Sequence, residues 1–238
     1  MLDFLRRSST NEIMDDLACQ GPVVFQTLRE LDFINHWLGG NAVTIQALTS
    51  AWQTLPASQE ITIADLGCGS GEMLRIIHRL AKRENRSVRL IGFDANPNIV
   101  TYARNHSEGY ESVEFHPIDI FSEEFRAQQF DIVLATLFMH HFSEDQLVSA
   151  FSNLKRQVRH AIIVNDIHRH PLAYYSIQLL TRLFSRSAMV KFDAPLSVLR
   201  AFRKSELESI LKRAHLNTFR LRWKWAFRWQ LLISTARS

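Results

Sequence analysis

The chain has 238 residues, of which 46% are hydrophobic and 22% are charged, and this composition is that of a globular protein with one sizeable core. It contains no run of about 18 uncharged apolar residues, so we expect no transmembrane helix. Residues 1–16 lack the apolar core of a secretory signal, and two cysteines, Cys19 and Cys68, do not make a disulfide framework. We therefore expect a cytoplasmic protein.

Charge is unevenly placed along the chain. From Lys155 onward there are 17 Lys and Arg against 4 Asp and Glu, whereas the preceding residues carry 11 against 20. A basic C-terminal third of this kind indicates either an ordinary solvated surface or an anionic partner. The candidate partners are a nucleic acid, an anionic membrane surface and an acidic carrier protein.

The order of predicted elements indicates a mostly parallel sheet. Residues 11–55 are predicted to be helical, with a break at Gly39 and Gly40. Strands are then predicted at 61–66, 87–94, 112–119, 130–136 and 160–166, and helices at 71–84, 96–106 and 143–157 separate them. An apolar and basic helix at 169–186, a helix at 203–215 and a hairpin at 217–236 complete the chain. Such alternation predicts βαβ units with helices on both faces of the sheet.

The stretch IADLGCGSGE, residues 63–72, places a glycine-rich turn directly after the first strand. In open α/β sheets, ligands bind at such carboxyl ends of strands. The dinucleotide fingerprint would need glycine where Glu72 stands, and the GK[ST] of a P-loop is absent. Because Asp65 and Glu72 flank the turn, the sequence predicts a nucleoside-like ligand that lacks phosphate and carries positive charge.

This stretch resembles motif I of the class I S-adenosylmethionine-dependent methyltransferases, and further landmarks follow in order along residues 61–166. The resemblance implies a Rossmann-like α/β fold whose seven-stranded sheet is mostly parallel and closes in an antiparallel hairpin. It implies S-adenosyl-L-methionine as cofactor, with Asp94 at the ribose and Asp119 and Ile120 at the adenine. The full set of expected cofactor-binding residues is Asp65, Gly67, Cys68, Gly69, Gly71, Asp94, Ala95, Asp119, Ile120 and Thr136.

Parts outside this core resemble bacterial small-molecule methyltransferases, some of which accompany aromatic polyketide-type synthases. These parts are MDD at 14–16, INHWLGG at 34–40 and NDIHRHPLAYY at 165–175. We expect residues 1–55 to form a helical lid or cap and residues 56–238 to form the methyltransferase domain, with a helical insertion at about 169–200. His36 and Trp37, beside the two glycines, are candidate lid residues over the cofactor.

Four histidines follow the fourth and fifth predicted strands, and those strands border the same cleft in this topology. We expect His141 or His168 to act as general base, with His140 as a further candidate and Asp166 as the group that orients the imidazole. We expect no metal site, because the histidines are not matched by a cysteine ligand and the nearby carboxylates belong to the cofactor.

The predicted function is methylation of a small, aromatic, hydroxyl-bearing metabolite, in which a histidine removes the hydroxyl proton. Tyr174, Tyr175, Leu179 and Phe184 are candidate walls of the acceptor pocket. Three alternatives remain open: an RNA methyltransferase that uses the basic third, a quinone-type C-methyltransferase at a membrane surface, and a cofactor-binding protein without catalysis. The acceptor and the oligomeric state are not predicted.

Overall fold

A computed structural model describes residues 3–235, so the last residue of the predicted hairpin and the outermost ends of both predicted domains lie outside the described residues. The sheet has seven strands in the order β3-β2-β1-β4-β5-β7-β6. In chain order the strands are β1 (Ile61–Leu66), β2 (Val88–Asp94), β3 (Val113–Pro117), β4 (Phe130–Thr136), β5 (Val158–Ile167), β6 (Phe219–Lys224) and β7 (Arg228–Ser234). Strands β1 to β5 pair in parallel, and β7 pairs antiparallel with both β5 and β6. The predicted fold is confirmed.

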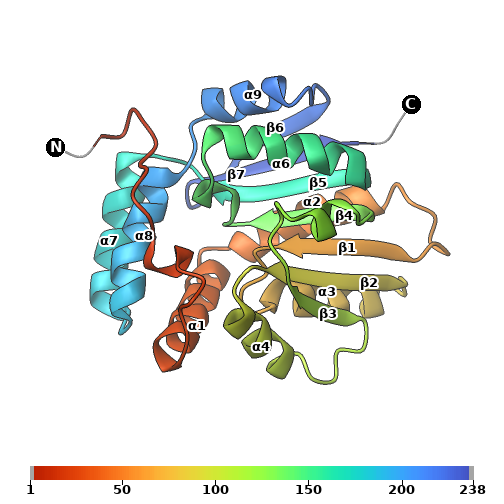
Figure 1. Ribbon diagram of the computed structural model, residues 1–238, viewed down its shortest axis with the longest axis horizontal. Helices are drawn as coiled ribbons and strands as arrows, with labels where there is room; N and C mark the ends of the chain where they lie inside the picture. The colour runs from red at the N-terminus through yellow and green to blue at the C-terminus, as the bar shows by residue number, and fades with distance from the viewer. Residues whose placement is uncertain (1–2, 236–238) are drawn as a thin grey trace.

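Helices lie on both faces of the sheet and at one end of it (Figure 1). The α-helices are α1 (Pro22–Trp37), α2 (Gly40–Trp52), α3 (Glu72–Arg83), α4 (Pro97–Asn105), α5 (Glu123–Arg126), α6 (Glu144–Gln157), α7 (Pro171–Phe184), α8 (Ala188–Arg200) and α9 (Lys204–Arg213). Two 3-10 turns, η1 (Ile13–Asp15) and η2 (Met139–His141), complete the described elements.

Alternation along the strands divides the core into two clusters. In β4, Val133 and Ala135 join the cluster under α5, α6 and α9, whereas Ile132 and Leu134 join the cluster under α2, α3 and α4. Successive strand side chains point to opposite faces, and both faces are covered, which is why these strands are apolar at nearly every position.

A cap made of η1, α1, α7 and α8 lies at one end of the sheet, and Figure 1 shows α1, α7 and α8 gathered on the left. Val24 and Leu28 of α1 pack with Ile99 and Tyr102 of α4 and with Met189 of α8. Helix α2 is placed differently, because its residues Ala47, Leu48 and Trp52 belong to the core under the sheet. The N-terminal helices therefore contribute to two layers, one over the sheet end and one on a sheet face.

Candidate functional site

The glycine turn after β1 is fixed by both backbone geometry and close packing. Gly67 and Gly71 have φ of +65° and +77°, a region that residues with a Cβ rarely adopt. A Cβ on Gly67 would lie 2.1 Å from the ring of Phe138, and one on Gly71 would lie 2.5 Å from the ring of Phe115. A Cβ on Gly69 would lie 3.7 Å from Cδ2 of Leu28, an ordinary contact distance, so Leu28 of the cap lies over the turn at this glycine.

Two carboxyl groups lie beside this turn: that of Asp65 near the end of β1 is buried, and that of Asp94 at the end of β2 is half-buried. Asp94 accepts hydrogen bonds from the backbone N–H of Gly69 at 3.4 Å and of Asn96 at 3.0 Å. Burial raises the pKa of Asp94 to about 6, against the opposing effect of those N–H groups and of His141. Burial together with the charge of Asp94 raises the pKa of Asp65 to about 7. A ligand that carries positive charge or hydroxyl donors would stabilise the ionised form of both carboxyl groups.

The remaining predicted cofactor residues differ in their surroundings. Cys68 is buried, and its Sγ lies close enough to Gly92 that a Cβ there would be 2.9 Å away, so the thiol fills space between β1 and β2. Ile120 is buried in the core and Thr136 Oγ1 lies 3.0 Å from Thr44 Oγ1 of α2. Ala95 is half-buried beside Asp94.

Strand β3 ends at Pro117, two residues earlier than the prediction that it ends in Asp119. Asp119 therefore stands in the loop after the strand, where it is exposed and its Oδ1 accepts the N–H of Phe121 at 2.9 Å. Ser122, rather than Asp119, caps the short helix α5. The carboxylate of Asp119 is thus left facing outward from the strand end.

The cap side of the glycine turn is provided by residues that the sequence did not single out. Leu28 of α1 lies over Gly69, and burial raises the pKa of Asp32 of α1 to about 6, with Glu72 adding to the effect. Asn41 of α2 donates to Glu72 at 3.0 Å. His36 and Trp37 are exposed, and Trp37 lies against Phe33 with 74% of its surface accessible. Their role as lid residues over the cofactor stays a prediction.

The histidines reach the site through a strained turn after β4. Leu137 has φ of +53°, an uncommon value for a residue of its size, and its N–H donates to the carbonyl of Asn165 at 2.8 Å. The turn places Phe138 over Gly67 and leads directly into η2, which carries His140 and His141. The cofactor turn and the histidines are therefore held by neighbouring strand ends.

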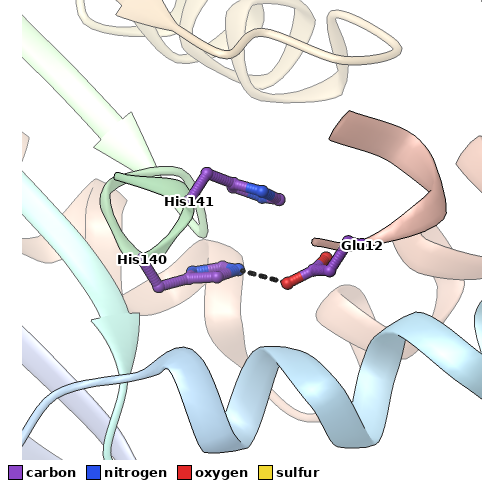
Figure 2. Close-up of side chains that lie close together, drawn as sticks. All are labelled: Glu12, His140 and His141. Atoms are coloured by element: carbon purple, nitrogen blue, oxygen red, sulfur yellow. Dashed lines mark ion pairs between the residues drawn. The ribbon is translucent and has the colours of Figure 1, made fainter. Parts of the chain in front are cut away.

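His140 is buried between two carboxylates, as Figure 2 shows for one of them. Its Nδ1 lies 2.7 Å from Oδ1 of Asp166, and its Nε2 lies 3.6 Å from Oε1 of Glu12, too far for a hydrogen bond. Burial alone would lower the pKa of His140, but Asp166 and Glu12 raise it to about 10. His140 is therefore a buried cation in this arrangement.

His141 is the more accessible of the two and faces a different partner. Its Nδ1 lies 2.6 Å from Oδ1 of Asp15 in η1, and 23% of its side chain is exposed. The ring of His141 lies 6.4 Å from that of Phe138, between centroids, and Phe138 covers Gly67, so the imidazole lies near the cofactor turn. Hydrogen bonds from His141 and Arg200 hold the pKa of Asp15 well below its usual range, against the effect of burial.

Arg200, at the end of α8, ties the cap to the histidine turn. Its guanidinium pairs with Asp15 and donates to the carbonyl oxygen of His141 at 2.6 Å and of His140 at 3.4 Å. The same side chain donates to the carbonyl of Thr10 at 3.2 Å. The N-terminal segment, the insertion and η2 are therefore joined by one buried cation.

Glu12, His140 and His141 each offer a ligand atom, and these atoms lie within 4.8 Å of one another (Figure 2). By composition the three side chains could hold a metal ion. The Nε of Arg200 lies 3.9 Å from Oε1 of Glu12, however, and the imidazole of His140 is already held as a cation by Asp166 and Glu12. The negative charge of Glu12 is thus balanced by the protonated imidazole of His140 and by the guanidinium of Arg200.

His168 is not brought together with His141. Strand β5 ends at Ile167, and His168 forms an isolated bridge with Phe202 and accepts the indole N–H of Trp223 at 3.3 Å. It lines an open pocket with His170, Arg203, Lys204 and Trp229, among others. Asp166, which was expected to orient the base, contacts His140 instead.

The sheet order, the glycine turn and the acidic strand ends define a class I methyltransferase architecture. Residues 63–161 match the family described as a methyltransferase domain. Residues 63–161 are therefore a methyltransferase domain, in a chain with the class I fold that its sequence predicts, and S-adenosylmethionine is the cofactor that this domain implies. Among the described residues, no helix is long and apolar enough to span a membrane.

Relatives by sequence are much longer than this chain. It is 26% identical over 157 residues to a non-reducing polyketide synthase of Penicillium roqueforti, covering 64% of this chain and 6% of that protein. It is 31% identical over 98 residues to the tRNA (carboxymethyluridine(34)-5-O)-methyltransferase alkbh8 of Xenopus tropicalis, covering 41% of this chain and 14% of that protein.

Solved structures share the fold at low identity. The plantazolicin methyltransferase BpumL, in complex with S-adenosylhomocysteine, has a TM-score of 0.65 and 16% identity, covering 90% of this chain and 95% of its own. Human N-acetylserotonin methyltransferase in complex with S-adenosylmethionine has a TM-score of 0.60 and 17% identity, covering 90% of this chain and 56% of its own.

Proposed function

We propose that the protein transfers a methyl group from S-adenosylmethionine to a hydroxyl oxygen of a small, aromatic metabolite. The observation that carries the proposal is the position of His141: its imidazole is 23% exposed, is fixed by a carboxylate and lies near Phe138, which covers the cofactor turn. A phenol is mostly protonated at neutral pH, so an oxygen acceptor gains from a base at this point.

The cofactor residues proposed from the sequence fit a ligand with a sulfonium and an ammonium group. Asp65 and Asp94 supply negative charge at the turn, and Asp94 also offers acceptors for ribose hydroxyls. The bare backbone at Gly69 allows close approach, and Ile120 offers an apolar contact for the adenine. The cofactor supplies an electrophilic methyl group when bound.

The protein's own part in the reaction is positioning and proton removal. Asp15 fixes the ring of His141 through Nδ1 and leaves Nε2 to take the hydroxyl proton of the acceptor. Leu28 lies over the turn at Gly69, and a covered turn favours in-line transfer between fixed groups. We place His141 ahead of His168 as the base, because His168 lies in a separate pocket.

The second candidate is an RNA acceptor, favoured by the basic C-terminal third and by similarity to a protein named as a tRNA methyltransferase. The small-molecule and RNA acceptors differ in how their binding depends on salt, because contacts with RNA phosphates weaken steeply as the salt concentration rises.

The test begins with calorimetric titration of S-adenosylhomocysteine into the wild type, Asp94→Asn and the exposed control Asp145→Asn on α6. We expect the Asp94 change to weaken binding by one to two orders of magnitude, since a charge-assisted hydrogen bond contributes about 1.5–3 kcal/mol. Transfer of labelled methyl groups to a panel of phenols and to total tRNA follows. Labelling of tRNA alone, or unchanged transfer by His141→Ala, would refute the proposal.

A further inference from the structure

Helix α7 presents a second apolar side to solvent. Along one stripe of the helix, at spacings of three and four residues, stand large side chains with 55–65% of their surface exposed: Leu172, Tyr175, Leu179 and Leu183. On its inner side Ala173 and Thr181 are buried, and Tyr174, Ile177 and Leu180 are half-buried. A surface helix normally keeps its apolar residues on the side toward the core. The outer stripe is thus available to something outside the chain.

This orientation also corrects an expectation about the acceptor pocket. Tyr175, Leu179 and Phe184 were predicted to form its walls, but they are 55%, 60% and 77% exposed. Tyr174 alone of that set is half-buried, and its ring lies against Phe4 at 5.7 Å between centroids. Tyr175, Leu179 and Phe184 therefore do not enclose a pocket for a small molecule.

Exposed charges on the α7–α8 hairpin all have the same sign. Arg182, Arg186 and Lys191 are exposed, and the acidic residue of the segment 171–200, Asp193, is buried. Asp193 accepts the backbone N–H groups of Ile13 and Met14, so it is occupied by the N-terminal segment. The hairpin presents an apolar stripe next to positive charge, while the carboxylate of Glu30 of α1 accepts the backbone N–H groups of Arg186 and Ser187 at the α7–α8 turn.

We propose that this face, made of the α7 stripe with Arg182, Arg186 and Lys191 and called here the α7 face, docks on an anionic phospholipid surface. Apolar side chains of an amphipathic helix enter the boundary between headgroups and acyl chains, while basic residues remain among the phosphates. A phospholipid surface would thus contact both the apolar stripe and the basic residues of the α7 face.

Other partners use the α7 face less completely. A symmetric dimer through this face would bring two sets of cations together, with no exposed acid on the hairpin to pair with them. A nucleic acid would engage the cations but leave Leu172, Leu179 and Leu183 without a partner.

Docking also has a consequence for the site. The same hairpin ends in Arg200, which holds Asp15 and the histidine turn, so the cap that covers the site would lie against the lipid. If the proposed function holds, an apolar phenolic acceptor dissolved in the bilayer would reach the site from this side. Docking itself does not depend on which group is methylated.

The test is flotation of the full chain with vesicles of phosphatidylcholine, with and without about 30% phosphatidylglycerol, at about 0.1 and 0.5 M NaCl. We expect flotation with the anionic vesicles at low salt. Leu179→Glu/Leu183→Glu should lower the partition coefficient at least tenfold. Arg182→Glu/Arg186→Glu should lower it by more than tenfold, since each basic residue near an anionic surface strengthens binding roughly fivefold.

Matched controls carry the same changes on another exposed region, in Arg220→Glu/Arg222→Glu and Trp225→Glu, and they should float like the wild type. Each variant is also titrated with S-adenosylhomocysteine, so that loss of docking is separated from loss of the fold or of the cofactor site. Equal loss in the control variants, absence of flotation by the wild type, or a dimer in sedimentation that Leu179→Glu dissociates would each overturn the proposal.

Discussion

His140 and Asp166 form a buried pair across 26 residues of sequence, with Nδ1 and Oδ1 2.7 Å apart and Glu12 on the other side of the ring. The pair joins the turn after β4 to the end of β5, which are the two strand ends nearest the histidine site. Because the imidazole carries a proton here, His140 stabilises the site by charge and leaves proton removal to His141.

Replacing Asp166 by Asn should therefore destabilise the protein by about 3–5 kcal/mol near neutral pH, since it leaves a buried cation short of its partner. The folded-state pKa of His140, about 10, lies above its ordinary value of 6.5. Its contribution is thus fully present below about pH 6.5 and is lost as the pH rises through about 10. Urea unfolding of wild type and variant across this range measures the difference. A gap below about 1 kcal/mol at neutral pH would show that the pair is not formed as described.

Asp15 gives a second prediction, on catalysis. Asp15→Asn removes the charge that fixes the ring of His141, so we expect kcat for methyl transfer to fall about 10- to 100-fold with little change in the affinity for S-adenosylhomocysteine. Asp16→Asn, an exposed neighbour, is the matched control. In a double variant with His141→Ala, the Asp15 change should cost nothing further. Full additivity would mean that Asp15 acts on the cap and not through the imidazole.

The sequence predicts features set by neighbouring residues better than contacts between residues that lie far apart along the chain. The apolar run of β4 and the glycines at 67 and 71 are local signals, and they predicted the strand and the glycine turn that the structure has. The ligand of that turn stays a prediction. Asp15 meets His141 across 126 residues and Arg200 across 185, and no local pattern encodes such contacts. The sequence MDD at 14–16 stood out, but the contacts of Asp15 with His141 and Arg200 were not predicted.

Helix α7 illustrates another limit. Its periodicity predicts an amphipathic helix, yet periodicity alone does not say toward which side the apolar stripe points. Helix α7 is apolar on two sides: Ala173, Ile177 and Leu180 are buried or half-buried, whereas Leu172 and Leu179 are exposed. The prediction of pocket walls failed at this step.

The metal question supplies a third prediction. Since Arg200 lies 3.9 Å from Glu12 and His140 is held as a cation, we expect binding of S-adenosylhomocysteine and methyl transfer to be unchanged after dialysis against a chelator. Metal analysis of the freshly purified protein and titration with Zn²⁺ complete the test. Stoichiometric zinc that is lost in Glu12→Gln, together with loss of activity on chelation, would instead make Glu12, His140 and His141 a metal site.

The last prediction concerns Asp65 and the stability that the fold loses by burying an ionised carboxyl group at the cofactor site. Its folded-state pKa of about 7 lies above the ordinary value of 3.8, so the folded state binds the proton more tightly than the unfolded chain does. The resulting stability is fully present below about pH 4 and is lost as the pH rises through about 7. Asp65→Asn should then raise the free energy of unfolding by about 1–3 kcal/mol near pH 8 and change it little near pH 4.

The same variant should bind S-adenosylmethionine more weakly, because a cationic ligand is stabilised by the ionised carboxylate that the unliganded fold disfavours. Thermal unfolding at the two pH values, with and without the ligand, measures both effects together. Glu114→Gln, an acid on β3 with 37% of its side chain exposed, is the control and should show neither. If Asp65→Asn is instead destabilising at the higher pH, its carboxylate is a structural acceptor in the turn, and its assignment to the cofactor would have to be withdrawn.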